Sequence, residues 1–162
     1  MANEVFNVFY LIVVSIEAIV VIVTLILGFI TYFKNKRSER QDNVTKLCNE
    51  FITNDDLHDA VHIVEFESNW FGDDFYNGGK DSTEKKIDKL FMFLNHIIYL
   101  KNNKRISDED FKLFEYKIKA VFQNPDTIEY LSFIESFSKI GRRAPSSFQQ
   151  LIEYGRKNNY LE

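Results

Sequence analysis

Two histidines and two carboxylates recur at helical spacing in one short segment of the chain. Asp55, His58, His62 and Glu65 follow one another at steps of three or four residues. At about 100° per residue these side chains fall along one flank of a helix. Two histidines four residues apart can share a metal ion with a nearby carboxylate, which predicts a metal-dependent enzyme. The H-E-x-x-H pattern is missing because Asp59 follows His58, so we favour a solvated flank of mixed charge and predict no cofactor.

A second candidate site is a segment in which aromatic residues alternate with acidic residues and glycines. Its aromatic members include Trp70, Phe71, Phe75 and Tyr76. The glycines indicate a loop, and loops held on a rigid scaffold often carry binding residues. The segment therefore predicts a partner-binding loop. The alternative is a hydrophobic lid in which Trp70, Phe71 and Phe75 pack onto the helices.

An ionisable residue, Glu17, lies inside an apolar run that extends from Val5 to Phe33. A helix crosses a bilayer with about 20 apolar residues, so the run predicts a membrane anchor. An ionisable group inside a membrane is costly and is usually turned towards protein or water. We therefore expect Glu17 to face a partner helix, which is a second copy of the chain or another membrane protein. The alternatives are a glutamate that extends to the membrane surface and a pore or proton path.

Three smaller residues in the same run could support such a contact. Ser15 and Thr24 offer polar groups to a partner helix, and Gly28 allows close approach of a second backbone. No G-x-x-x-G motif accompanies them. We therefore expect these residues to assist the membrane contact of Glu17.

The charges that flank the apolar run predict its orientation. Basic residues follow it at Lys34, Lys36, Arg37 and Arg40, and no Lys or Arg precedes it. Because basic flanks stay in the cytoplasm, the N-terminus is expected outside and the rest of the chain inside. A cleaved signal peptide would have a shorter apolar region behind basic residues, which this chain lacks. The expected location is a cell inner membrane with a single span.

The elements that position these residues are predicted to be helices only. We expect an all-α chain with a transmembrane anchor at 1–33, a basic segment at 34–40 and a cytoplasmic bundle of five or six helices at 41–162. Helix starts are indicated at Asn54, at Ser82, at Ser107 and at Asn124–Pro125. Apolar residues between these starts recur at helical spacing, as at Ile87, Leu90, Phe91, Leu94, Ile97 and Ile98.

Composition and charge limit the ligands of this bundle. The chain has a net charge of −4, and no broad basic face accompanies it. Nucleic acid is therefore not an expected partner. The single cysteine, Cys48, cannot form an internal disulfide, which agrees with a reducing compartment.

One part of the bundle has a familiar pattern. The apolar helix Lys89–Ile98 is followed by a polar turn and by Ile106–Phe111, which begins a second helix. This arrangement resembles a family of small bacterial single-pass membrane proteins whose helical cytoplasmic domain has no known function. The chain departs from the family at Asn95 and His96, where the first apolar helix of the family usually carries an acidic residue. The resemblance implies the architecture and no particular chemistry.

Three classes of function follow from these observations. The first is a membrane-tethered protein-interaction or regulatory module, in which Glu17 helps to select a membrane partner. The second is a membrane-anchored enzyme that uses the histidine and carboxylate flank. The third is a membrane-active oligomer in which Glu17 faces a pore. We favour the first because it requires no residue that the sequence lacks.

Overall fold

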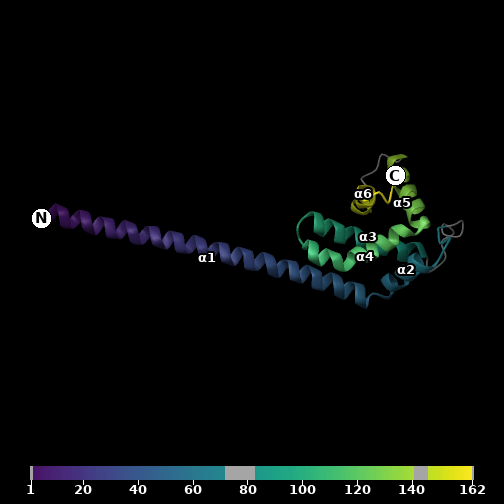
Figure 1. Cartoon of the computed structure of the whole chain (residues 1–162), viewed down its shortest axis with the longest axis horizontal. Coiled ribbons are helices and arrows are strands. Elements are labelled where there is room, and N and C mark those ends of the chain that lie inside the picture. The colour runs from purple at the N-terminus through teal and green to yellow at the C-terminus, as the bar shows by residue number, and fades with distance from the viewer. Residues whose placement is uncertain (1, 72–82, 141–145, 162) are drawn as a thin grey trace. The chain divides into compact units, whose positions relative to one another are not determined.

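The protein is helical in every part that the structure describes. This computed structural model describes residues 2–71, 83–140 and 146–161, which contain no β-strand. The prediction of an all-helical chain is therefore confirmed for these ranges. Figure 1 shows the helices α1 (Ala2–Thr53), α2 (Asp55–Phe66), α3 (Thr83–Asn102), α4 (Asp108–Gln123), α5 (Pro125–Ile140) and α6 (Gln149–Lys157).

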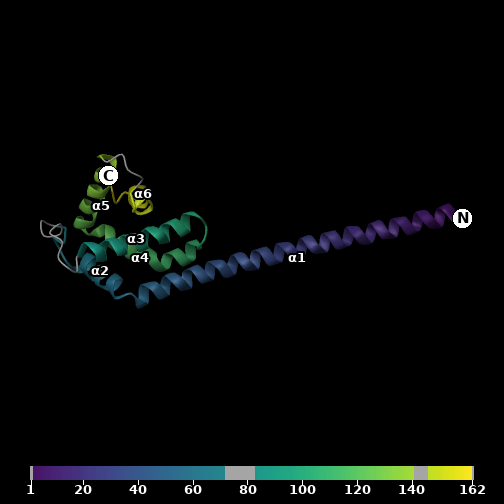
Figure 2. The same ribbon diagram turned by 180° about the vertical axis from the view of Figure 1, so that it is seen from behind.

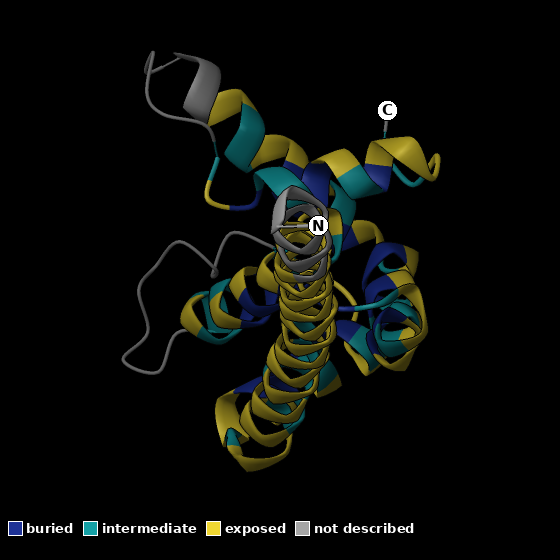
Figure 3. Ribbon diagram, turned by 90° about the vertical axis from the view of Figure 1, so that its left-hand side faces the viewer, coloured by how far each residue is buried: buried dark blue, intermediate teal, exposed yellow. Residues whose placement is uncertain are grey.

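The chain forms two compact units, which we describe separately as unit 1 (Met1–Gln41) and unit 2 (Asp42–Glu162). Unit 1 belongs to α1, and its described residues from Val13 to Asn35 are all exposed, as the yellow ribbon of α1 in Figure 3 shows. The apolar part of α1 is long enough to cross a membrane. At 1.5 Å per residue, the stretch from Val13 to Phe33 spans about 30 Å, which is the thickness of a hydrocarbon core.

Unit 2 is organised around α3. This helix contacts α2, α4 and α6, and it lies between α6 and α4 in Figures 1 and 2. Its sequence explains this position because its apolar residues cover more than one face. The buried residues of α3 are Ile87, Leu90, Phe91, Phe93, Leu94, Ile97 and Ile98. Of the charged residues of α3, Lys85 and Lys89 are exposed, whereas Lys86 and Asp88 are half-buried.

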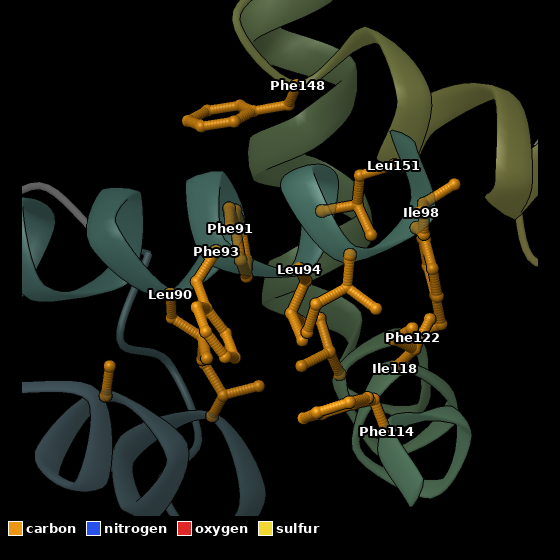
Figure 4. Close-up of a cluster of buried hydrophobic side chains, with 14 of the residues drawn as sticks. Leu90, Phe91, Phe93, Leu94, Ile98, Phe114, Ile118, Phe122, Phe148 and Leu151 are labelled. Atoms are coloured by element: carbon orange, nitrogen blue, oxygen red, sulfur yellow. The ribbon is translucent and has the colours of Figure 1, made fainter. Parts of the chain in front are cut away.

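Aromatic side chains join α3 to its neighbours in the core (Figure 4). The ring of Phe93 on α3 lies 6.3 Å from that of Phe114 on α4, in edge-to-face geometry. Phe91 meets Phe148, the residue before α6, at 5.8 Å and 90°. Burial of a large apolar side chain stabilises the fold by about 1.5–3 kcal/mol relative to exposure, so these contacts hold α4 and α6 against α3.

Two helix starts are built as the sequence predicts. Ser107 accepts a hydrogen bond from the Asp110 N–H at 3.1 Å, and Asp110 accepts one from the Ser107 N–H, which completes a capping box at α4. The side-chain oxygen of Asn124 accepts a hydrogen bond from the Asp126 N–H at 2.8 Å, with Pro125 as the first residue of α5. At α2, Asn54 occupies the cap position without a side-chain capping bond.

The basic segment 34–40 is part of α1 and does not end the helix. No glycine or proline lies between Gly28 and Thr53, so nothing in the chain breaks the helix there. The end of α1 lies in unit 2, where Leu47 is buried in the core and Phe51 stacks on Phe93 at 5.8 Å. The Asn43 side chain also donates a hydrogen bond to the Arg105 carbonyl at 3.2 Å.

Candidate functional site

The strongest candidate in unit 1 is the face of α1 that carries Glu17. Glu17 is exposed, and so are the neighbouring apolar side chains Ile16 and Val20. A carboxyl group placed among exposed aliphatic side chains has no hydrogen-bonding environment of its own in a bilayer. It gains one only by reaching the membrane surface or by contacting another polar group.

The structure separates the three residues that we expected to assist Glu17. On a continuous helix, Thr24 and Gly28 lie within about 20° of Glu17, whereas Ser15 lies roughly 160° away. The hydroxyls of Ser15 and Thr24 donate to the carbonyls of Leu11 and Val20, at 2.7 and 2.8 Å. Gly28 is open, because a Cβ built there would meet no atom within 4 Å. Thr24 and Gly28 therefore share the Glu17 face, and Ser15 does not.

The four basic residues that predict orientation follow the apolar stretch directly on α1. Lys34 and Arg37 are exposed, whereas Lys36 and Arg40 are half-buried. The Lys36 ammonium lies 5.8 Å from the centre of the Tyr32 ring. Such a contact suits an interface, where the aromatic ring and the ammonium both prefer the region of the lipid head groups.

The histidine and carboxylate flank of α2 is divided among several neighbours. Glu65 accepts a 2.6 Å hydrogen bond from the Lys117 ammonium of α4. The His62 ring packs on Phe66 at 5.2 Å, and the His58 ring packs on Phe51 at 5.6 Å. Asp55 is exposed. In residues 2–71, 83–140 and 146–161, no three His, Cys, Asp or Glu side chains converge so that they could hold a metal ion.

The other acids of α2 attach this helix to α3. The Lys89 ammonium donates to Asp56 at 2.8 Å, and the Lys86 ammonium donates to Asp59 at 2.6 Å. The hydrogen bond from Lys89, together with its charge, lowers the pKa of the Asp56 carboxyl. Both pairs are near the surface, where salt screens them, so they direct the packing of α2 more than they stabilise it.

The described part of the aromatic segment is packed against the domain. Trp70 is buried, and its ring contacts those of Phe91 and Tyr130 at 6.4 and 5.9 Å. The Phe71 ring lies 5.3 Å from that of Tyr130. Trp70 therefore belongs to the core, and the half-buried Phe71 packs against it. Phe75 and Tyr76 of the predicted partner loop lie outside the described residues, as does Ser82.

A half-buried acid, Asp88, is bonded to one ring of this cluster. The Tyr130 hydroxyl donates a 2.6 Å hydrogen bond to the Asp88 carboxylate on α3. Burial raises the pKa of the Asp88 carboxyl, and the hydrogen bond from Tyr130 partly offsets this effect. The pair connects α5 to α3 through Tyr130, whose ring also contacts that of Trp70. Burial between α3 and α5 is therefore enough to explain the raised pKa of Asp88, and no catalytic role is needed.

The structure also shows a surface feature that sequence reasoning missed. A groove of about 380 Å³ lies between the end of α2 and α4, with Phe66, Tyr116 and Ala120 among its lining residues. Phe66 and Tyr116 are 73% and 71% exposed, which is high for aromatic side chains. Glu65 and Glu67 also line the groove, without a lysine or arginine among the lining residues. The sequence gives little indication of this groove because α3 and its connecting segments separate α2 from α4 in the chain.

No protein-family model matches this chain, and no curated protein or solved structure shows significant similarity to it. The candidate site is therefore interpreted from its own geometry.

Proposed function

We propose that this protein is a membrane-tethered interaction module. Unit 1 anchors it as a single span, Glu17 contacts another helix inside the membrane, and unit 2 acts as a helical module in the cytoplasm. The observation that carries this proposal is the exposure of Glu17 in a stretch from Val13 to Asn35 in which every residue is exposed.

The energetics favour a partner over a glutamate surrounded by lipid. A charged group at the centre of a bilayer costs about 2.5–3.5 kcal/mol or more. Glu17 lies about 6 Å inside the start of the stretch from Val13 to Phe33, so its cost is smaller, and extension to the surface lowers it further. A polar contact between membrane helices contributes about 0.6–2 kcal/mol. Glu17 therefore assists association and selects its geometry, while packing of the surrounding side chains supplies the rest.

The basic flank supports a cytoplasmic position for unit 2. Lys34, Lys36, Arg37 and Arg40 follow the apolar stretch immediately, and basic residues close to a span are retained on the cytoplasmic side. A cell inner membrane with the N-terminus outside is the location that fits this charge distribution.

The groove between α2 and α4 is the surface of unit 2 that best suits a protein ligand. Its exposed aromatic residues, Phe66 and Tyr116, offer apolar contact area. Glu67 adds a negative charge, whereas Glu65 is already paired with the Lys117 ammonium of α4. The fitting ligand is a protein segment with an apolar side chain next to a basic one.

Photo-cross-linking of the full-length protein in its membrane tests the contact of Glu17. A photoactivatable residue at Val21, which lies on the same face, should form a covalent adduct with a membrane protein. The variant Glu17→Leu should still insert and should give several-fold less adduct. Ile19→Leu is the matched control. Ile19 is exposed and has apolar neighbours, as Glu17 does, but it lies on the opposite side of α1.

Adduct that is unchanged in Glu17→Leu would show that the glutamate has no role in assembly. Absence of any adduct at Val21 would remove the membrane contact altogether. Phe66→Ser changes the groove of unit 2 and not the membrane helix, so it should leave the yield of the membrane adduct unchanged.

A further inference from the structure

Polar and small residues recur along α1 with a period of seven. Glu17, Thr24 and Thr31 are seven residues apart, and Gly28 lies between the last two. The full series alternates steps of four and three residues, and we call it the heptad face: Tyr10, Val14, Glu17, Val21, Thr24, Gly28, Thr31 and Asn35. Between Val13 and Asn35, all of its members are exposed.

The spacing of the heptad face determines how a partner helix would cross it. Steps of four and three average 3.5 residues, slightly below the 3.6 residues per turn of a straight helix. A partner with the same period stays in contact when the two helices cross in a left-handed sense at about 20°. Small and β-branched residues such as Gly28, Thr24 and Val21 let the backbones approach closely.

The opposite side of the helix is different in kind. Ile19, Ile22 and Ile26 lie there, at roughly 140–180° from the centre of the heptad face, and all three are exposed. Their aliphatic side chains suit lipid, and Ser15, which also lies on this side, donates its hydroxyl to the Leu11 carbonyl within the helix. The two sides of the helix therefore differ, with one suited to protein contact and one to lipid. A helix that served only as an anchor would not need this difference.

We propose that a second copy of this chain packs on the heptad face, in parallel and in register. This inference rests on the proposed function, in which Glu17 faces protein. A second copy inserts with the same orientation, so it presents Glu17, Thr24 and Gly28 at the same depths. The two Glu17 side chains then lie at the same depth, next to one another.

An antiparallel copy or an unrelated helix lacks this match. In an antiparallel pair, Glu17 of one chain would lie near Gly28 and Thr31 of the other and not near its Glu17. Such a copy would also have to insert against the charge bias of the basic flank. A helix of unrelated sequence would need polar and small residues at each of the same depths. The seven-residue period is thus best satisfied by the helix that already carries it.

Disulfide scanning of the full-length protein in membranes tests this arrangement. Cys48 is the only cysteine, so Cys48→Ser provides a background without thiols. Single cysteines at Val21, Thr24 and Gly28 should form oxidised dimers in several-fold higher yield than single cysteines at Ile19, Ile22 and Ile26. All six positions are exposed on the same helix, so they differ mainly in the face that they occupy.

A steric variant gives a second reading. Gly28→Leu should reduce the dimer yield of Thr24→Cys, because a leucine on the heptad face separates the helices. Ile26→Leu, on the opposite face, should leave that yield unchanged. Glu17→Gln should retain more dimer than Glu17→Leu because an amide still forms hydrogen bonds.

The outcomes separate this inference from the proposed function. Equal cross-linking on both faces, or no cross-linking, would exclude the parallel dimer. If the photo-adduct at Val21 then contains another protein and still depends on Glu17, the proposed function stands without the second copy. If dimers form on the heptad face but Glu17→Leu leaves the photo-adduct unchanged, the dimer stands and the role of Glu17 falls.

Discussion

The backbone N–H of Trp70 donates a 2.6 Å hydrogen bond to the carboxylate of Asp126, which lies 56 residues further along the chain. The Phe71 N–H donates to the same oxygen at 3.4 Å. Asp126 is buried in the first turn of α5, and its carboxylate also faces the positive end of that helix. This single side chain fixes the chain where it leaves α2 and positions the Trp70 ring in the core.

Removal of the Asp126 carboxylate should destabilise unit 2 because it leaves buried N–H groups without an acceptor. We expect Asp126→Ala to lower the free energy of unfolding by about 1–3 kcal/mol. Asp126→Asn keeps an oxygen acceptor and should cost less. Trp70 is the only tryptophan, so its fluorescence during urea unfolding of the full-length protein in detergent reports the effect. Equal stability of Asp126→Ala and the natural protein would show that water satisfies these groups.

Truncation of Leu94 tests the central position of α3. Leu94 is 1% exposed, so Leu94→Ala should lower the free energy of unfolding by about 2–5 kcal/mol. Met92 lies on the same helix and is 57% exposed, so Met92→Ala should cost less than about 1 kcal/mol. The same fluorescence measurement compares the two. A small effect of Leu94→Ala would place α3 at the edge of the domain.

The Asp88 carboxyl should make stability depend on pH. Its pKa is raised by burial, so the folded state takes up a proton at higher pH than the unfolded chain. The contribution of Asp88 to the free energy of unfolding therefore increases as the pH falls through the folded-state pKa, and the increase is complete below the unfolded value of 3.8. Between about pH 7 and pH 4, the natural protein should gain stability relative to Asp88→Asn.

The comparison with Asp88→Asn is necessary because other acids act in the opposite direction. Asp56 has a lowered pKa, and its stabilising effect is lost as the pH falls. This effect is common to both proteins and cancels in the difference between their urea midpoints. A difference that does not change with pH would show that Asp88 titrates alike in the folded and unfolded states.

Gly155 on α6 should tolerate no larger residue. A Cβ at this position would lie 2.7 Å from the Phe122 ring and 2.8 Å from the Leu161 side chain. Although alanine favours a helix by about 1 kcal/mol over glycine, the overlap forces the core to shift. We expect Gly155→Ala to cost about 1–3 kcal/mol in unfolding free energy. Lys157→Ala, an exposed change on the same helix, should be within about 0.5 kcal/mol of the natural protein.

The orientation of the span can be tested with reporters fused after Glu162. A reporter that is active only in the cytoplasm should be active, and one that requires export should be inactive. Replacement of Lys34, Lys36, Arg37 and Arg40 with glutamine should weaken this preference, because these residues carry the charge bias. Activity of the exported reporter on the natural sequence would reverse the proposed location of unit 2.

Local features of the fold could be predicted from the sequence because their partners are close in the chain. Ser107 and Asp110 form a capping box over three residues, and Asn124 and Pro125 start α5 directly. The helical spacing of Leu90 and Leu94 likewise depends only on neighbours. Each of these signals acts within one or two helical turns.

Contacts between distant segments could not be predicted in this way. The pairing of Glu65 with Lys117 depends on how α2 meets α4, and many surface lysines could have served equally well. The hydrogen bond from Trp70 to Asp126 could not be predicted for the same reason, because it depends on how the segment after α2 meets α5. The continuation of α1 to Thr53 was missed because basic residues at 34–40 suggested a separate segment, although they do not oppose a helix.

The position of α6 has a consequence for synthesis of the protein. α6 leaves the ribosome after α3, and Leu151 and Ile152 are buried on a domain in which α6 contacts α3. While the chain is still being made, the side of α3 that α6 will cover remains in water. Neighbouring nascent chains then associate through this surface. Chains truncated before Gln149 should consequently aggregate, whereas chains that include α6 cover this surface themselves.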